Sequence, residues 1–367
     1  MKSSLNDEHC TEVVIVGAGL CGLATAFLLH EEGRSVHVVE ASGRPGGRIR
    51  SVFDKSTGDY LADLGPSWIW PAFQPVVQRW LERLNLEVFA QYDSGQTLID
   101  YGPDQEAKAA FLPGQDGNFR VVGGPQALID ALIKHLPDDR ISFEKPVRAI
   151  HASENGVEIQ SGTTTFRANQ VVMAIPPRIA SQTIELSKAL PTSLHQALDM
   201  MPTWMAPHAK FVAVYDEPFW RSQGLSGRIA SRAGPIVECH DHCSPDESVA
   251  ALWGFIGWPH DMRIKMNDEL EAHIYSQLKR CFGPNNPEPA AIYIQDWARE
   301  EFLTTSNDLK GPMNHPSVGP DSLRRSYFEG RVFFAGSETA TQSPGLIEGA
   351  LDAAERVANG INERCLD

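Results

Sequence analysis

The sequence has no run of apolar residues near the roughly 18 that a membrane-spanning helix needs. Its start, MKSSLNDEHC, carries acidic side chains where a secretory signal needs an apolar stretch, and no twin arginine is present. Cysteine is sparse, and the thiols are scattered along the chain (Cys10, Cys21, Cys239, Cys243, Cys281 and Cys365). We therefore expect a cytoplasmic protein with reduced thiols and no membrane partner.

Positive charge is also scarce. The chain has 32 lysines and arginines against 47 aspartates and glutamates, a formal net charge of −15. This balance argues against nucleic acid or an anionic membrane as a partner. It suits a cationic substrate, although many enzymes are equally acidic. With 367 residues, 42% of them hydrophobic, the chain can bury a substantial core, and its length predicts two intertwined domains.

What the sequence does have begins with a glycine-rich loop between a strand and a helix. The apolar run 12–16 (EVVIV) predicts a buried parallel strand, and GAGLCG follows it at 17–22. A helical pattern stops at 31–33, and a second strand at 35–39 ends on Glu40. Strand, loop, helix, strand and acid in this order predict a dinucleotide-binding unit.

Each part of this unit has a physical task. Gly17 permits the tight turn, Gly19 lets the backbone approach a pyrophosphate, and Gly22 lets helix and strand pack closely. The N–H groups that begin the helix favour phosphate charge, and Glu40 accepts hydrogen bonds from ribose hydroxyls. A glycine-rich turn without a ligand is the alternative, and the unit alone does not separate FAD from NAD.

A second glycine run, ASGRPGGR at 41–48, follows immediately. It places flexible backbone and the charges of Arg44 and Arg48 beside the same pyrophosphate. An NAD domain has no use for such a run at this point. A solvated basic turn is the alternative.

The C-terminal region contains a further strand, loop and helix. The run 331–335 (RVFFA) predicts a buried strand, GSET at 336–339 a polar loop, and Ser343-Pro344 the N-cap and first position of a helix that ends near Gly360. Such a helix start can stabilise the negative charge of a reduced flavin. Taken alone, the segment could also be one more unit of the sheet.

With these blocks together, the sequence resembles the flavin-containing amine oxidases, the family of monoamine oxidases, polyamine oxidases and L-amino acid oxidases. Matching blocks lie in the family's order from residue 12 to about residue 360, and they are specific together rather than singly. Besides the two glycine runs they are DLGPSW at 63–68, VGG at 122–124, KPV at 145–147, AIPP at 174–177, KFVAVYDEPFW at 210–220, DW at 296–297, AGSETA at 335–340 and SPGLIEGA at 343–350.

The resemblance implies an α/β fold: a Rossmann-like FAD-binding domain assembled from separated segments, with an α+β mixed-sheet substrate domain. The FAD-binding domain would comprise residues 1–72, 121–199 and 300–367. The substrate domain would comprise residues 73–120 and 200–299. The stretch between the Trp68 block and Gly123-Gly124 is shorter than the family's usual helical insertion, which predicts a trimmed lid.

The resemblance also implies which residues contact FAD. Covalent members carry a cysteine before the last strand, whereas Cys281 and Cys365 lie outside that region, so FAD should be held non-covalently. The implied cofactor-binding residues are Gly17, Gly19, Leu20, Gly22, Glu40, Ala41, Arg44, Gly46, Gly47, Arg48, Leu64, Gly65, Pro66, Ser67, Val147, Trp297, Gly336, Ser337, Glu338, Gly345 and Leu346.

Lys210 is the first candidate for a functional side chain. It lies in an alternating apolar run, where a lysine faces solvent at a strand edge or is buried for a reason. The resemblance implies that Lys210 holds a water near flavin N5 and assists the reaction with oxygen. It also implies that Trp297 packs near the flavin ring, where an ordinary core aromatic is the alternative. We expect Trp68, His208 and Leu346 to line the substrate cavity.

One feature of the monoamine oxidases is missing from the sequence. Those enzymes frame the substrate nitrogen between two aromatic rings, but the position after Gly345 is Leu346. No Phe, Tyr or Trp occurs between Phe302 and Tyr327, where the second ring would lie. Either the amine is aligned differently or the substrate is not a simple monoamine.

The sequence CHDHC at 239–243 is dense in metal-ligand types. Strand alternation would place its histidines on one face and the cysteines with Asp241 on the other, and no second ligand pair lies nearby in the sequence. We expect a polar loop and no metal site.

The predicted function is oxidation of a C–N bond in a small amine or amino acid derivative, by hydride transfer to flavin N5. Molecular oxygen would be the acceptor and hydrogen peroxide a product. The alternatives are a related flavin desaturase or oxidase with a non-amine substrate, and a non-catalytic flavoprotein scaffold. The sequence indicates no oligomeric state.

Overall fold

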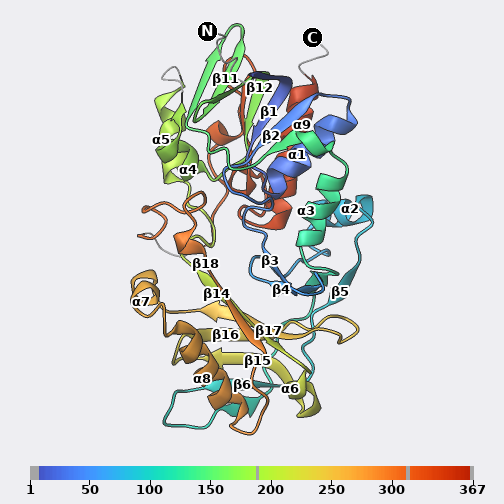
Figure 1. Cartoon of the computed structure of the whole chain (residues 1–367), viewed down its shortest axis with the longest axis vertical. Coiled ribbons are helices and arrows are strands. Elements are labelled where there is room, and N and C mark those ends of the chain that lie inside the picture. The colour runs from blue at the N-terminus through green and yellow to red at the C-terminus, as the bar shows by residue number, and fades with distance from the viewer. Residues whose placement is uncertain (1–7, 187–189, 311–314, 364–367) are drawn as a thin grey trace.

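The computed structural model describes residues 8–186, 190–310 and 315–363. Cys365 and the outermost ends of the predicted FAD-binding segments lie outside the described residues. The described chain forms an elongated molecule with one large sheet in each half, and the chain passes between the halves several times (Figure 1). No helix in these three ranges is both long and apolar enough to cross a membrane.

The upper sheet in Figure 1 is parallel at its centre and antiparallel on one side. Its order is β13-β10-β11-β12-β1-β2-β9, and β19 also pairs with β12. Strands β1, β2, β9, β12 and β19 run parallel, while β10, β11 and β12 form an antiparallel meander. The strands are β1 (Glu8–Val16), β2 (Val36–Val39), β9 (Ile141–Ser142), β10 (Ala149–Ser153), β11 (Gly156–Ser161), β12 (Thr164–Met173), β13 (Glu185–Leu186) and β19 (Val332–Phe334).

Helices cover both faces of this sheet because its central strands are apolar on both sides. In β1, Val13 and Ile15 face one core and Val14 and Val16 face the other. The first core is closed by α1 (Leu20–Glu31), α2 (Pro75–Arg83), α3 (Gln126–Lys134) and α9 (Ile347–Glu363). The second is closed by α4 (Pro177–Thr183) and α5 (Thr192–Met200).

The lower sheet has the order β18-β14-β17-β16-β15-β6-β7. One face packs on α8 (Leu270–Phe282), and the other faces the upper half. Helices α6 (Phe219–Ser222) and α7 (His260–Lys265) lie at its ends. The strands are β6 (Gln96–Asp100), β7 (Lys108–Ala110), β14 (Ala209–Tyr215), β15 (Leu225–Ser231), β16 (Ile236–Asp241), β17 (Ala250–Ile256) and β18 (Ala291–Asp296).

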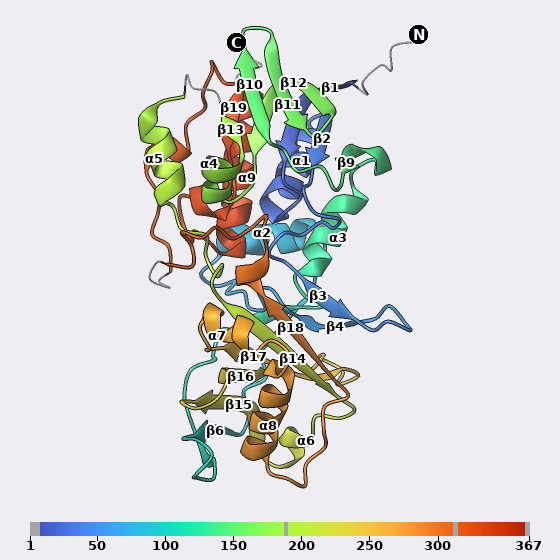
Figure 2. The same ribbon diagram turned by 60° about the vertical axis from the view of Figure 1, so that its left-hand side comes forward.

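Two small sheets join the halves. The hairpin of β3 (Ser51–Phe53) and β4 (Tyr60–Asp63) projects from the junction, as Figure 2 shows. Strands β5 (Val88–Ala90) and β8 (Phe119–Val121) form the other pair. The mixed α/β architecture agrees with the predicted fold class.

Two local predictions were wrong. Helix α9 begins at Ile347 rather than at Pro344. The chain first forms a 3₁₀ turn, η4 (Ser337–Thr339), and the Gly345 N–H donates a hydrogen bond to the Ser337 carbonyl of this turn. Ser343 accordingly has a φ of +48°, which no helical N-cap adopts. The CHDHC segment is not a polar loop: its first three residues end the buried strand β16.

A buried glutamate joins α9 to α2. Glu348, 1% exposed, accepts hydrogen bonds from Val76 N–H (3.1 Å) and Val77 N–H (2.7 Å), the first donors of α2, which has no cap of its own. We expect Glu348→Ala to lower the free energy of unfolding by about 2 kcal/mol, because both donors become unpaired. Urea unfolding would measure this, with exposed Glu363→Ala of the same helix as the control. An equal loss in both variants would contradict the capping role.

Candidate active site

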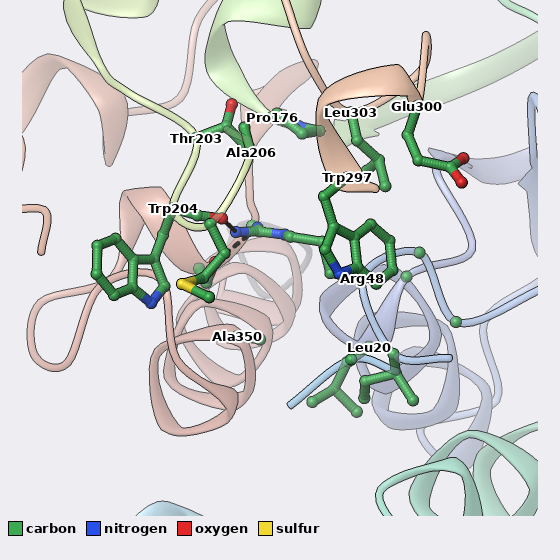
Figure 3. A pocket seen from close by; sticks show the side chains of 18 of the residues that line it. Leu20, Arg48, Pro176, Thr203, Trp204, Ala206, Trp297, Glu300, Leu303 and Ala350 are labelled. Atoms are coloured by element: carbon green, nitrogen blue, oxygen red, sulfur yellow. Dashed lines mark hydrogen bonds between the residues drawn. The ribbon is translucent and has the colours of Figure 1, made fainter. Parts of the chain in front are cut away.

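A cavity of about 720 Å³ lies between the two halves of the molecule. Its walls come from the loops after β1 and β2, the segment after β4, the start of α9, and residues of β14, β16 and β17 that face the upper half. Every residue named above as cofactor-binding, catalytic or substrate-lining lies in this wall except Gly22. The structure therefore brings together residues from position 17 to position 346. Figure 3 shows Arg48, Trp204 and Trp297 among the side chains that line this cavity.

The glycines of the first loop are sterically required at two positions. Gly17 has a φ of +105°, and a Cβ there would lie 2.7 Å from the Ala174 carbonyl oxygen. A Cβ at Gly22 would lie 2.0 Å from the Gly17 carbonyl oxygen, which explains why Gly22 packs behind the cavity instead of lining it. Gly19 is different, since nothing lies within 4 Å of its Cβ position. No described side chain caps the α1 N-terminus at Gly19, so its N–H groups are available to an anion.

Glu40 is buried at the end of β2 and holds the loops around it. One carboxylate oxygen accepts from Ala18 N–H (2.7 Å), and the other accepts from Ser42 N–H (2.8 Å) and the Ser42 hydroxyl (2.7 Å). Arg44 supports the next loop from inside, donating to the carbonyls of Gly47 (2.8 Å) and Ile49 (3.1 Å). Both side chains thus shape the backbone that lines the cavity.

Arg48 connects the second glycine run to the C-terminal loop. It forms an ion pair with Glu338 (2.7 Å), which is fully buried, and donates to the Ser337 hydroxyl (2.9 Å) and the Trp204 carbonyl (3.3 Å). A charge buried in this way needs such a partner. The pair places one positive and one negative group in the cavity wall beside Trp204.

Lys210 is buried in the lower sheet, where β14 pairs with β17 on one side and with the edge strand β18 on the other. The exposed strand-edge alternative is therefore wrong. Its Nζ donates to the Gly65 carbonyl (2.7 Å) and the Ser67 hydroxyl (2.6 Å) and lies 3.9 Å from the centroid of the Trp253 ring. Burial lowers the Lys210 pKa to about 7, although the Asp63 carboxylate opposes this shift. The amine can exchange a proton near neutral pH.

The lowered Lys210 pKa makes stability depend on pH. Between pH about 7 and the ordinary value of 10.5, the unfolded chain keeps a proton on Lys210 that the folded chain has lost. The free energy of unfolding should therefore rise with pH across this window, by up to about 1.4 kcal/mol per pH unit. We expect Lys210→Met to lack this contribution when urea unfolding is measured from pH 7 to 10. Parallel curves for the parent and the variant would show that Lys210 has an ordinary pKa.

The other predicted functional side chains line the same cavity as Lys210. The indole N–H of Trp297 donates to the Leu64 carbonyl (3.2 Å), and the backbone N–H of Trp297 donates to the His208 carbonyl (3.0 Å). Burial lowers the pKa of His208, so its ring is neutral near pH 7. Trp68 donates to the Gln91 side chain (2.8 Å). These contacts hold the rings rigidly in the cavity wall.

Several residues line the cavity although the sequence did not predict them to do so. Cys21 accepts a hydrogen bond from Gly336 N–H (3.0 Å), and burial raises its thiol pKa to about 11. Trp204 lies against Gly345, where a Cβ would come within 2.7 Å of the Trp204 Cβ. The cavity is therefore lined by aromatic rings, although the two rings expected near Leu346 are absent from the sequence. The missed aromatic side chains are Trp70, Trp204, Trp253, Phe255, Phe302 and His315.

The histidines of the CHDHC segment have structural partners. His242 Nε2 accepts from Asp63 N–H (3.1 Å) and contacts the Tyr60 hydroxyl (3.1 Å), while the His240 ring is tilted against Trp253 with ring centroids 5.0 Å apart. Burial lowers the His242 pKa to about 3, so this ring is neutral. Among the described residues, no group of three or more His, Cys, Asp or Glu side chains could hold a metal ion.

Comparisons with known proteins agree with this geometry. The family model described as flavin containing amine oxidoreductase matches residues 104–362, and a model for NAD(P)-binding Rossmann-like domains matches residues 15–84. The chain belongs to the flavin containing amine oxidoreductase family. It is therefore a flavin-dependent oxidoreductase of the amine oxidase type.

Relatives match over nearly the whole chain. A probable flavin-containing monoamine oxidase A of Dictyostelium discoideum is 25% identical, over 97% of this chain and 98% of its own length. The flavin-containing amine oxidase B of Sus scrofa is 25% identical, over 95% of this chain and 86% of its own.

Two solved structures share the fold at lower identity. Cyclohexylamine oxidase from Brevibacterium oxydans aligns with a TM-score of 0.81 at 23% identity, and wild-type putrescine oxidase bound to putrescine with 0.79 at 22%. Each alignment covers 97% of this chain and 100% of the other. The predicted fold class and family are confirmed.

Proposed function

We propose that the cavity binds FAD non-covalently and that the protein oxidises a C–N bond of a small amine or amino acid derivative. When bound, FAD would accept a hydride equivalent from the carbon beside nitrogen and pass the electrons to oxygen, giving hydrogen peroxide. The observation that carries this proposal is the buried Lys210 amine, presented to the cavity by Gly65 and Ser67.

The residues of the upper half fit the adenosine and pyrophosphate of FAD. The uncapped α1 N-terminus at Gly19 would face the pyrophosphate, and the carboxylate of Glu40 would accept from ribose hydroxyls. Val147 would contact the adenine through its backbone. The Arg48–Glu338 pair would lie near the polar part of the flavin ring. We propose the same cofactor-binding set that the sequence predicts, with Gly22 acting through packing.

The lower half fits the substrate. Lys210 would hold a water beside the flavin, with Trp297 packing near the ring. Trp68, His208 and Leu346 would enclose the substrate and exclude solvent water. We propose that residues 1–72, 121–199 and 300–367 form the FAD-binding domain and residues 73–120 and 200–299 the substrate domain, with Trp68 and Leu346 of the FAD-binding domain also facing the substrate.

Non-covalent binding is supported by the described cysteines. Cys239, Cys243 and Cys281 lie outside the cavity wall. Cys21 lines the cavity, but its raised pKa keeps it a thiol, which is a poor nucleophile.

The test is anaerobic mixing of the purified yellow protein with a panel of amines and amino acids while the oxidised flavin band is recorded. Bleaching by one chemical class is expected and would identify the substrate type. If photoreducible FAD is present and no member of the panel bleaches it, the alternatives of a non-amine substrate or a non-catalytic scaffold take precedence. A colourless protein that takes up no FAD would overturn the proposal.

A further inference from the structure

A buried carboxylate lies close to Lys210 without lining the cavity. Asp63, 1% exposed, is the last residue of β4. Gly65 and Ser67, which bind the Lys210 amine, follow it within four residues. Asp63 is not one of the residues that form the cavity wall. Its charge therefore acts on Lys210 through the protein interior, where water screens it least.

The fold is arranged around this carboxylate. Its two oxygens accept hydrogen bonds from the Ser51 hydroxyl (2.8 Å) and the Tyr60 hydroxyl (2.8 Å). Gly124, the last residue of the VGG block, supplies the space, because a Cβ there would overlap the Asp63 carboxylate and the Tyr60 ring. Burial by itself would raise the Asp63 pKa. The contact with His242 and the positive charges nearby outweigh burial and hold that pKa below its ordinary value, so the carboxylate is ionised near pH 7.

Three buried charges meet in this region without a direct ionic partner. Arg120, 2% exposed, donates to the carbonyls of Cys243 (2.8 Å) and His242 (3.2 Å), and it forms no ion pair within the described part of the chain. Over the same residues, no carboxylate lies within 4.0 Å of the Lys210 amine. Asp63 lies 3.2 Å from His242, but that ring is neutral. The three charges can therefore be balanced only by one another.

The charge balance of this group depends on Asp63. An arginine keeps its proton at any pH at which the protein is folded, so the charges of Arg120 and Asp63 offset each other. Without the carboxylate, two positive charges would share one low-dielectric interior. Lys210 would then release its proton more readily, because arginine cannot. The carboxylate thus controls whether the buried amine is charged.

The other titratable groups on the elements packed against Lys210 do not replace Asp63. They are uncharged, paired with each other, or open to solvent. Besides burial, the charges that act on the Lys210 pKa are Asp63, which raises it, and Arg120, which lowers it. The remaining groups are His240 and His242, both neutral near pH 7, Arg50 and Glu300, which form an ion pair (3.2 Å), and Glu238, which is 45% exposed.

We propose that Asp63 is a positioning residue for the reaction with oxygen: acting through the protein interior, it keeps the Lys210 amine protonated, and Arg120 opposes it. The inference rests on the proposed function, because it concerns the charge of the amine that the proposed function places beside the flavin. It also gives the DLGPSW block a second task. One short segment supplies both the hydrogen-bond partners of the amine and its counter-charge.

The first measurement is the rate at which oxygen reoxidises the photoreduced protein, from about pH 5 to pH 10. In the parent this rate should fall as the pH rises through the Lys210 pKa, and Lys210→Met should lack the fall. Asp63→Asn should move the fall at least about one pH unit lower, and Arg120→Met should move it about as far upward. A unit charge within ~8 Å at an effective dielectric constant of ~20 shifts a pKa by roughly this much or more. Loss of packing alone would not produce shifts of opposite sign.

The second measurement needs no flavin. Urea unfolding of each apoprotein is compared, over the same pH range, with that of the same protein carrying Lys210→Met, and the difference isolates the contribution of Lys210. This contribution rises with pH above the pKa of the folded state, which is about 7 in the parent. The rise should begin about one pH unit lower in Asp63→Asn and higher in Arg120→Met.

The control is Asp100→Asn, which removes another buried carboxylate of the lower half. Asp100 is 0% exposed, pairs with Arg280 (2.6 Å) and lies on β6, four strands from β14 in the same sheet. This change should leave the pH of both transitions where it is in the parent, whatever it does to stability.

A fall in the parent that stays at the same pH in Asp63→Asn would overturn the inference and leave the proposed function standing. If Asp63→Asn does not fold, Arg120→Met decides by the same criterion: an unmoved transition overturns the inference, and an upward shift supports it. If the parent shows no fall that Lys210→Met removes, the proposed role of Lys210 fails, and the inference fails with it.

Discussion

Replacing Lys210 with methionine is expected to slow the reaction of the reduced protein with oxygen about a hundredfold, the usual effect of removing one preorganised charged group from a reaction site. The ammonium is fixed by Gly65 and Ser67, and it can stabilise the negative charge that develops on oxygen as it accepts electrons. Methionine fills a similar volume without the charge. The substrate itself does not need this charge, so anaerobic reduction by an amine should change only a few-fold.

Stopped-flow mixing measures the two half-reactions separately. The reduced protein is mixed with oxygenated buffer, and the oxidised protein is mixed with an amine in the absence of oxygen. Lys55→Met, an exposed lysine in the β3–β4 hairpin, is the matched control and should change neither rate. Flavin content must be equal in all three proteins. Reoxidation of Lys210→Met at the parent's rate would exclude the proposed role of Lys210.

A pair of alanine substitutions in the first glycine loop should separate folding from cofactor binding. Gly22→Ala places a Cβ 2.0 Å from the Gly17 carbonyl oxygen, a contact that neither backbone can relieve locally. We expect a loss of about 3 kcal/mol or more in the free energy of unfolding, and a protein that retains little flavin. Gly19→Ala meets nothing within 4 Å and has an ordinary φ of −73°.

The Gly19→Ala apoprotein should therefore unfold within about 1 kcal/mol of the parent. Its affinity for FAD should still fall at least tenfold, because the Cβ would occupy the space that a pyrophosphate needs beside the α1 N-terminus. Urea unfolding of the apoproteins and fluorescence titration with FAD measure the two quantities. Unchanged FAD affinity in Gly19→Ala would mean that the pyrophosphate does not lie at this helix end.

The first dinucleotide unit was predictable because its signals are local. The apolar run before Gly17, the helical spacing after it and the acid at Glu40 all lie within about thirty residues. In the structure they form β1, α1 and β2 in that order, with Glu40 at the end of β2. The steric demand on Gly22 comes from the carbonyl oxygen of nearby Gly17, so a sequence pattern captures it.

The points that local patterns left open or predicted wrongly involve residues whose surroundings come from distant parts of the chain. By its own pattern Lys210 could have been at an exposed edge, but β18, some eighty residues later, covers that side. The CHDHC segment has the composition of a loop, yet its first three residues pair with β17 and its cysteines pack in the core against α8. Helix α9 starts later than predicted because Gly345 N–H bonds to the carbonyl of Ser337 in the η4 turn, which no local pattern indicates.

The sequence by itself determined the family, the dinucleotide loop and many of the residues in the cavity wall, because the motifs that set the local backbone geometry are short runs of consecutive residues. Only the tertiary structure decided the environment of each functional side chain. Burial lowers the Lys210 pKa to about 7, and the Gly65 and Ser67 partners of its amine come from a segment far away in the sequence. Desolvation and pairing depend on which distant segments meet, and that is set by packing rather than by any local pattern.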